Sequence, residues 1–402
     1  MSPIPAPRPI WRAALSAACA SLIGIGIARF AYAPLLPAII AARWFAAPDA
    51  AYLGAANLAG YLLGVLMVGP LARRTSARTV LRVMMVVTTT SILACAWPVN
   101  FAWFFAWRLI SGVGGAAMMI LAAPAVLPHV APGRRGVVSG LIFMGIGIGV
   151  AASGTLVPLL LRQGLTQTWL GLGFICLVLT VVAWNGWPAP LTPAAPPARR
   201  PRRPRPRRPA LWALHLEYGL NAVGMVPHMI FLVAFVARGL GQGLDAGAFY
   251  WVMFGLGAVV GPLLAGRLAD SVGFTAALRL AFLVEALAAV TPALNHAPWA
   301  LIASSAIMGA STPGVVALVL GRAHQLAGRR GEAQGAAWRA ATTSFALGQA
   351  LAAYAMSYVL SHTGGDYALI FELGAGAILL ALLIDLGAGV VTQRARPKSP
   401  AG

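Results

Sequence analysis

Long apolar stretches follow one another along almost the whole chain, and this feature restricts the fold most. A helix that crosses a membrane needs about 20 mainly apolar residues. Only 9% of the residues are charged and 59% are hydrophobic, whereas soluble domains have about 25% charged residues. The chain is therefore predicted to be an all-α polytopic membrane protein with twelve transmembrane helices. The expected spans are 13–39, 50–70, 79–97, 101–126, 136–161, 167–187, 211–236, 247–268, 273–294, 298–321, 336–361 and 367–391.

The basic residues are distributed unevenly among the predicted loops. Of the 29 Lys and Arg residues, 23 fall on the side that holds both termini, three lie within or at the ends of spans, and three lie in the opposite loops, namely Arg43, Arg162 and Arg238. Such an asymmetry is typical of the positive-inside rule. Both termini are thus expected in the cytoplasm of a bacterial-type inner membrane. The net charge of +20 reflects topology and does not predict nucleic-acid binding.

A Pro- and Arg-rich segment, 189–210, divides six predicted spans from six others. The expected organisation is an N-terminal bundle (1–188), this cytoplasmic linker, a C-terminal bundle (211–393) and a cytoplasmic tail (394–402). Proline keeps such a linker extended. Its arginines either form a solvated spacer or dock on anionic lipid headgroups.

The two predicted bundles repeat each other. The stretch GPLARRTSARTVLR (69–82) aligns with GRLADSVGFTAALR (266–279) at an offset of 197 residues. Likewise HVAPGRRGVVSG (129–140) aligns with HQLAGRRGEAQG (324–335) at an offset of 195. Parallel six-span repeats of this kind indicate a transporter whose substrate site lies between the halves, near the middle of the membrane.

Two motifs resemble those of the major facilitator superfamily. GRLADSVG (266–273) is similar to its signature loop, G-x-L-A-D-x-x-G, and RLISGVGGA (108–116) to its fourth-helix motif. GIGIARFAYAPLLP (24–37) and the Gly-rich segment 139–158 resemble the YbfB/YjiJ group within it. The resemblance implies a monomeric transporter that works by alternating access, with helices one, four, seven and ten around the cavity. It also implies a cytoplasmic gate at Gly266, Asp270 and Gly273, although Arg73 replaces the aspartate in the first half.

One charge interrupts the first span, because Arg29 is the only charged residue between 13 and 41. A charge at the bilayer centre costs about 2.5–3.5 kcal/mol on insertion scales, so Arg29 is expected to face a polar cavity. The resemblance also places Arg108 on a cavity-lining helix. Guanidinium groups stay charged and fit carboxylates, so an anionic, carboxylate-bearing substrate is predicted. For Arg108, the alternative of holding backbone carbonyls of neighbouring helices is favoured.

Proton coupling requires a buried group that can take up and release a proton. Glu217 on the seventh span is the main candidate, with a surface carboxylate as the open alternative, and His228 is a second candidate that also fits a simple hydrogen-bonded histidine. Structural pairing is favoured for three other membrane-embedded acids, Glu285, Glu372 and Asp385. A mixed polar and apolar cavity wall is expected from Tyr32, Asn57, Tyr61, Asn221, Trp251, Trp338 and Gln349.

Sequence motifs of enzymes are absent. The chain has no Walker GxxxxGK[ST] motif, no HExxH and no cysteine pair with metal-ligand spacing, so neither enzymatic activity nor a cofactor or metal is expected. Three hypotheses remain. The first is a proton-coupled secondary transporter of a small anion; the second is an efflux antiporter for apolar or cationic compounds; the third is a membrane sensor or scaffold that does not transport.

Overall fold

The computed structural model describes residues 10–131, 134–189, 208–328 and 331–394. The predicted linker arginines 199–207 and the tail 395–402 lie outside these residues, as does the side chain of Arg73. The described part is helical throughout. Its elements are α1 (Ile10–Ser21), η1 (Leu22–Ile27), α2 (Tyr32–Ala41), α3 (Ala47–Arg74), α4 (Ala77–Ala94), α5 (Phe101–Val126), η2 (Leu127–His129), α6 (Arg135–Leu161), α7 (Leu165–Ala183), α8 (Arg208–Val226), η4 (Pro227–Phe231), α9 (Leu232–Ala234), η5 (Phe235–Gly239), α10 (Gly243–Leu294), α11 (Pro298–Ala327), α12 (Gly331–His362) and α13 (Tyr367–Arg394).

Local signals explain where many of these helices begin. Ser76 accepts a hydrogen bond from the backbone N–H of Thr79 at the start of α4, and Asn100 does the same for Trp103 at the start of α5. These are N-cap interactions. Proline occupies the first turn of α3 and of α11, where its missing N–H is not needed.

Ten helical segments in the described residues are long and apolar enough to cross a membrane. One of them, α10, has 52 residues and contains a single non-helical residue, Gly273. The chain turns there, so α10 supplies the two spans predicted at 247–268 and 273–294. Counting α10 twice and adding the 32-residue α12 gives the twelve expected spans. The predicted spans leave 269–272 as the connection, but these residues continue the helix and the chain turns only at Gly273.

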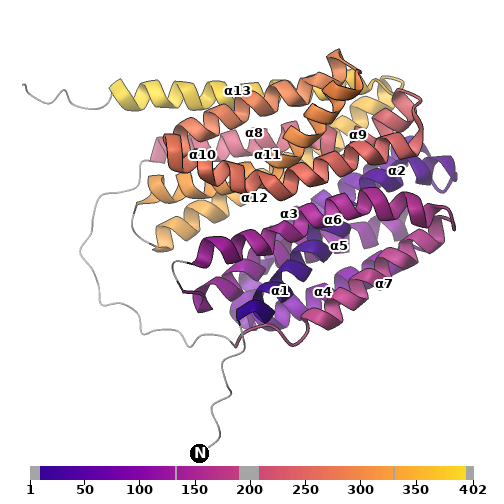
Figure 1. Cartoon of the computed structure of the whole chain (residues 1–402), viewed down its shortest axis with the longest axis horizontal. Coiled ribbons are helices and arrows are strands. Elements are labelled where there is room, and N and C mark those ends of the chain that lie inside the picture. Colours follow the sequence, from indigo (N-terminus) through magenta and orange to yellow (C-terminus); the bar gives the residue numbers. More distant parts are fainter. Residues whose placement is uncertain (1–9, 132–133, 190–207, 329–330, 395–402) are drawn as a thin grey trace, which may run out of the picture.

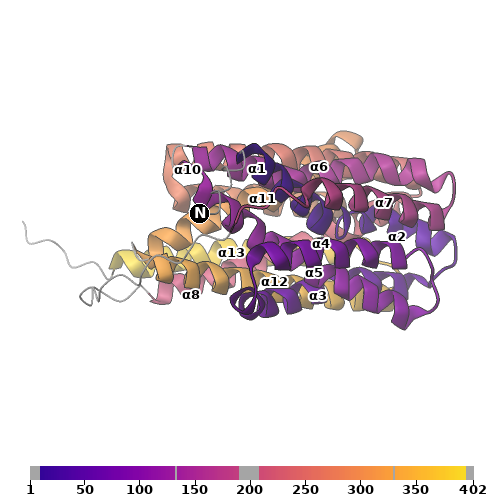
Figure 2. The same cartoon turned by 90° about the horizontal axis from the view of Figure 1, so that it is seen from below.

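The helices form two groups that follow the order of the chain. In Figure 1, α8 and α10–α13 lie in the upper part of the molecule and α1 and α3–α7 in the lower part, while α2 lies at the right, level with the upper helices. Figure 2 shows the helices running side by side along the long axis, with α6 and α10 along one edge and α3 and α12 along the other. These two helix pairs make the main contacts between the groups. We call α1–α7 the first half and α8–α13 the second half.

Glycine contacts confirm the internal repeat in three dimensions. A Cβ on Gly60 would collide with the backbone of Leu109, and one on Gly257 would collide with the backbone of Ala306. Both pairs are related by the same offset of 197 residues that aligns the sequences. The second and fourth helices of each half are therefore packed backbone to backbone in the same way.

The halves meet at the end of the molecule away from the point where α7 ends and α8 begins. There the rings of Tyr52 and Tyr354 stack 6.1 Å apart, and Gly147 and Gly154 of α6 pack on Val259 and Val252 of α10. Small residues of α6 thus allow close packing between the halves. Tyr52 and Gly154 lie toward that end of α3 and α6, whereas Gly147 lies near the middle of α6.

Candidate functional site

A cavity near the centre of the molecule is lined by both halves. Its accessible volume is only about 10 Å³, room for about one water molecule, so it is far smaller than typical ligand sites of about 300–1,000 Å³ and is tightly closed around its side chains. The first, second, fourth and seventh spans contribute to its wall, whereas the tenth span, which was expected there, does not. The lining residues are Arg29, Tyr32, Ala33, Gly54, Leu58, Arg108, Met229 and Ile230.

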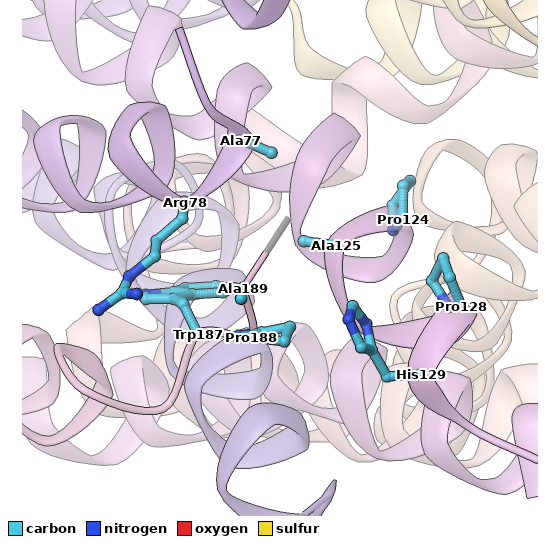
Figure 3. Close-up of a pocket in the computed structure, with 9 residues that line it drawn as sticks. All are labelled: Ala77, Arg78, Pro124, Ala125, Pro128, His129, Trp187, Pro188 and Ala189. Carbon is cyan, nitrogen blue, oxygen red and sulfur yellow. The ribbon is translucent and has the colours of Figure 1, made fainter. Parts of the chain in front are cut away.

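A larger cavity, with an accessible volume of about 220 Å³, lies elsewhere, within the first half. Figure 3 shows its wall, where Arg78, His129 and Trp187 are surrounded by alanine and proline side chains. These residues come from the start of α4, the end of α5 with η2, and the segment after α7. Because it touches one half only, this cavity cannot be exposed alternately to the two sides by movement of the halves. The central cavity is the better candidate site.

Irregular backbone places Arg29 in the central cavity. The segment η1 (Leu22–Ile27) is a π-helix, and residues 28–31 form turns before α2 begins. The N–H of Ala28 bonds the carbonyl of Ile23, five residues earlier. Gly26 makes close backbone contact with Gly149 of α6, which only glycines allow. Such widened turns are frequent at functional sites.

The guanidinium of Arg29 is held on one edge and lacks hydrogen-bond partners on the other. Its Nη1 donates to Oε1 of Gln349 at 3.0 Å, and its Cζ lies 4.0 Å from the ring centroid of Tyr61. Its Nε and Nη2 are buried and have no hydrogen-bond partner among the described residues. These two atoms form the edge of a guanidinium that binds a carboxylate through two parallel hydrogen bonds.

Arg108 has a different environment. Its Nη1 donates to the carbonyl of Ala28 at 2.7 Å, and its Nε donates to the carbonyl of Leu53 at 3.4 Å. The ring of Tyr32 lies 4.3 Å from its Cζ, and the Tyr32 hydroxyl donates to the carbonyl of Ala50. Arg108 thus joins three helices through carbonyl groups, in the manner of the structural alternative.

Two other predicted wall residues lie beside these arginines. Asn57 is buried and its Nδ2 donates to Oγ of Ser111 at 2.8 Å, which connects α3 to α5. Tyr61, one turn further along α3, is 4% exposed and lies under Arg29. The structure therefore brings Arg29, Tyr32, Asn57, Tyr61 and Arg108 together.

The predicted polar residues of α8 and η4 lie inside the second half and do not line the central cavity. Glu217 is 1% exposed, and Asn221 and His228 are fully buried. The Nδ2 of Asn221 donates to Oε2 of Glu285 at 2.6 Å. The ring Nε2 of His228 lies 2.9 Å from Oγ of Ser304. Glu217 is thus buried and is not a surface carboxylate.

A buried ion-pair cluster lies near Glu217. Asp385 on α13 pairs with Nε of Arg279 and, at 2.5 Å, with Nη2 of Arg322. These three charges also interact electrostatically with Glu217. The structural pairing expected for Asp385 is confirmed, whereas Glu372 is exposed.

The predicted gate residues lie at the turn inside α10. Gly266 is half-buried with open space around it, and Asp270 is exposed. Gly273 has a φ of 81°, in the region that glycine adopts at little cost. Arg73 lies near the end of α3. Asp270 forms no hydrogen bond or ion pair with another residue of the described ranges.

Three features of the site were not predicted. Met229 and Ile230 line the cavity because η4 turns them inward, and an apolar sequence gives no signal for that. The Arg29–Gln349 bond joins the halves, so it depends on how they dock; the sequence suggested Gln349 only as one of several wall residues. The Asn221–Glu285 pair depends on the rotation of two helices about their axes.

Comparisons with known proteins agree with this architecture. The family model described as "Uncharacterised MFS-type transporter YbfB" matches residues 21–386, so the chain belongs to this family. An MFS-type transporter, mpsC, of Macrophomina phaseolina is 31% identical over 88 residues, which are 22% of this chain and 17% of that protein's length. Among solved structures, a bacterial homolog of the human lysosomal transporter Spinster, in an inward-facing and unoccupied conformation, is similar with a TM-score of 0.66. The two are 15% identical, and the match covers 98% of this chain and 99% of the other. The protein is therefore a multi-pass secondary transporter and not an enzyme.

Proposed function

We propose that this transporter moves a small carboxylate-bearing anion together with protons, by rocking its halves about the central cavity. The observation that carries the proposal is the unpartnered Nε–Nη2 edge of Arg29, in a cavity lined by both halves. A carboxylate on this edge would receive two charge-assisted hydrogen bonds. It would also neutralise a charge that is costly to keep in the membrane.

The distribution of acids supports an anionic substrate. The first half contains a single carboxylate side chain, Asp49, which is exposed at the start of α3. Arg29 and Arg108 therefore have no buried counter-ion within their own half. Across the interface, Arg29 meets the neutral amide of Gln349. A substrate carboxylate would supply the missing negative charge.

Glu217 is the proposed proton carrier. Its carboxyl group is buried, and neither oxygen has a hydrogen-bond partner among the described residues. Burial of an unpaired carboxylate is costly, which favours binding of a proton. Nearby Arg322 and Arg279 favour its release. Such opposing influences suit a group that gains and loses a proton during each cycle.

Further parts of the proposal concern the gate and the topology. Asp270, with Gly266 and Gly273, would control the cytoplasmic end, and Arg73 would make this gate unequal between the halves. The chain would act as a monomer in a bacterial-type inner membrane with both termini cytoplasmic. Its bundles would be 1–188 and 211–393, joined by the linker 189–210 and followed by the tail 394–402.

The experiment is proton movement in proteoliposomes that contain the purified protein, challenged with a panel of small carboxylates and a panel of lipophilic cations. Proton flux evoked by a carboxylate, and lost in Arg29→Gln and in Glu217→Gln, is the expected result. Arg162→Gln is the matched control, because Arg162 is exposed at the end of α6. Flux evoked only by cations would overturn the proposal in favour of efflux of cationic compounds.

A further inference from the structure

The larger cavity, which the transport proposal does not use, lies where α4 begins and where the chain leaves α7. We call it the first-half cavity. Its accessible volume of about 220 Å³ has room for several water molecules or for a small solute group. Most of its wall is formed by alanine and proline, and Arg78 and His129 add polar groups (Figure 3). A cavity with this wall suits a ligand group that carries charge.

Arg78 and His129 have hydrogen-bonding capacity that the protein does not use. Nε of Arg78 and Nδ1 of His129 are both buried, and neither has a hydrogen-bond partner among the described residues. The guanidinium is always charged, and an imidazole nitrogen donates when it carries a proton. In Figure 3 the two side chains lie on opposite sides of the view, with Ala125 between them. Because buried polar groups without partners are costly, a ligand that accepts from both would stabilise this region.

No acidic side chain near the cavity balances the charge of Arg78. The only carboxylate of residues 1–188 belongs to Asp49, in the first turn of α3, whereas the cavity adjoins the start of α4, beyond the other end of α3. The first turn of a helix such as α4 also carries a partial positive charge. Both features favour an anion in the first-half cavity.

The second half fills the corresponding place with a charged side chain of its own. Arg322, in the last turns of α11, pairs with Asp385 of α13. At the offset of 197 residues that relates the packed glycines of these helices, Arg322 corresponds to Ala125, which lines the first-half cavity. At the offset of 195 residues that aligns the following loops, it corresponds to the apolar Leu127. A small or apolar residue thus replaces a guanidinium, and space remains.

The acid of this cluster is also missing from the first half. Asp385 pairs with Arg279 as well, and the equivalent of Arg279 is Arg82. Arg82 donates instead to the carbonyl of Trp184 and to the amide oxygen of Asn185. The second half therefore contains its own counter-ion at this end, whereas the first half contains basic side chains and a cavity.

We propose that the first-half cavity binds a phosphate group, which supplies the negative charge that Asp385 supplies in the second half. The oxygens of a tetrahedral phosphate point in several directions, so it can accept charge-assisted hydrogen bonds from Arg78 and His129 on different sides of the cavity. The bound group would connect the start of α4 with η2 and stabilise this end of the first half. The site is separate from the central cavity, and its occupation does not depend on which solute is transported.

Binding is tested with the full-length protein in maltoside detergent, which contains no phosphate. Inorganic phosphate is titrated while calorimetry measures its affinity and thermal unfolding measures stability, with chloride at equal ionic strength as the reference. Saturable binding and a raised unfolding temperature are expected. Arg78→Gln should weaken the affinity at least about tenfold, because a charge-assisted hydrogen bond is lost. Arg74→Gln is the matched control, since it removes an exposed arginine at the end of α3 and should leave the affinity unchanged.

Two variants of the wall separate binding inside the cavity from attraction to surface charge. Ala125→Leu fills the cavity without changing any charge and should weaken phosphate binding at least about tenfold. Ala125→Asp places a carboxylate in the wall, so it should raise the unfolding temperature without phosphate and abolish the further rise that phosphate causes. If Ala125→Leu bound phosphate as tightly as the unmodified protein, the cavity would not be the site and the proposal would be overturned.

A second titration distinguishes the two sources of a phosphate group. Short-chain phosphatidylglycerol is added to the same detergent-solubilised protein in place of inorganic phosphate. Saturable binding of inorganic phosphate, sensitive to Arg78→Gln, would support the site and identify a soluble ligand. Binding of the lipid alone, with the same sensitivity, would support the site and identify a lipid headgroup. Binding of neither, or equal affinity in Arg78→Gln and the unmodified protein, would overturn the proposal.

Discussion

The two halves of this transporter repeat one backbone arrangement but carry opposite charges in their interiors. Arg82 at the start of the third span donates from Nε to the carbonyl of Trp184 at 2.8 Å and reaches Asn185. Its equivalent, Arg279, pairs with the carboxylate of Asp385. The same position therefore uses neutral partners in the first half and an acid in the second.

This difference extends through both interiors. The first half contains Arg29 and Arg108 without a buried acid, whereas the second half contains the buried carboxyls of Glu217, Glu285 and Asp385. Two halves with one backbone arrangement can thus carry different tasks. Under our proposal, the first half binds the substrate anion and the second half handles the proton.

The largest expected effect concerns the buried ion pairs. Asp385→Asn leaves Arg279 and Arg322 without their carboxylate, and loss of one partner of a buried pair costs about 3–5 kcal/mol. Asn185→Ala in the first half removes the neutral amide that accepts from Arg82 and should cost about 1 kcal/mol. The free energy of unfolding in lipid bicelles measures both. If both variants lost the same free energy of unfolding, Asp385 would stabilise the second half no more than a neutral partner does.

The second effect separates the two arginines of the first half. Arg29→Gln removes a charge from the proposed substrate contact, which should weaken carboxylate binding about 30-fold or more, equivalent to about 2 kcal/mol or more. Arg29→Lys keeps the charge but loses the planar fork, so it should recover binding only in part. Arg108→Gln should instead lower stability, because the carbonyls of Ala28 and Leu53 lose their donor. Binding titrations and thermal unfolding distinguish these outcomes.

The third expected effect concerns the backbone packing that the two halves share. Gly112 packs on the backbone of Asn57, and its equivalent Gly309 packs on the backbone of Phe254. Overpacking at a tight contact costs about 1–3 kcal/mol, so Gly112→Val and Gly309→Val should destabilise the protein by similar amounts. Gly376→Ala is the control, since no atom lies within 4 Å of the added Cβ. A large inequality between the two variants would contradict equivalent packing.

The smallest effect lies at aligned turn positions. Ser76 has a φ of −98° and caps α4, whereas its equivalent Gly273 has a φ of 81°. Ser76→Gly should cost only a few tenths of a kcal/mol, while Gly273→Ser should cost about 1 kcal/mol or more, because a φ of 81° with a ψ of 156° is a conformation that essentially only glycine adopts. Unfolding measurements on both single variants test this. If Gly273→Ser were neutral, the two turns would be interchangeable.

The sequence predicted features that depend on local pattern. Apolar length gave the spans, and the alignment of 69–82 with 266–279 predicted a repeat that the contacts of Gly60 and Gly257 confirm. The single arginine at 29 predicted a cavity-facing position in the first span, and Arg29 lines the central cavity. These signals are local, since they depend on residue type and spacing along one helix.

Other features depend on how helices are wound and docked. The π-helix at Leu22–Ile27 shifts Arg29 relative to a regular helix, and no composition rule predicts that shift. Likewise Asn221 and Glu285 are 64 residues apart in the sequence. They meet only because two helices turn the faces that carry them toward each other. Structural pairing was expected for Glu285, but its partner became visible only in three dimensions.

The division of tasks between the halves is tested most directly by exchange of a radiolabelled carboxylate across proteoliposome membranes, with and without a proton gradient. The carboxylate is one that evokes proton flux in the unmodified protein. Glu217→Gln should retain exchange without a gradient but lose proton-driven accumulation, because its substrate contact is intact. Arg29→Gln should lose both. Retention of accumulation in Glu217→Gln, or of exchange in Arg29→Gln, would contradict the assignment of proton and anion to different halves.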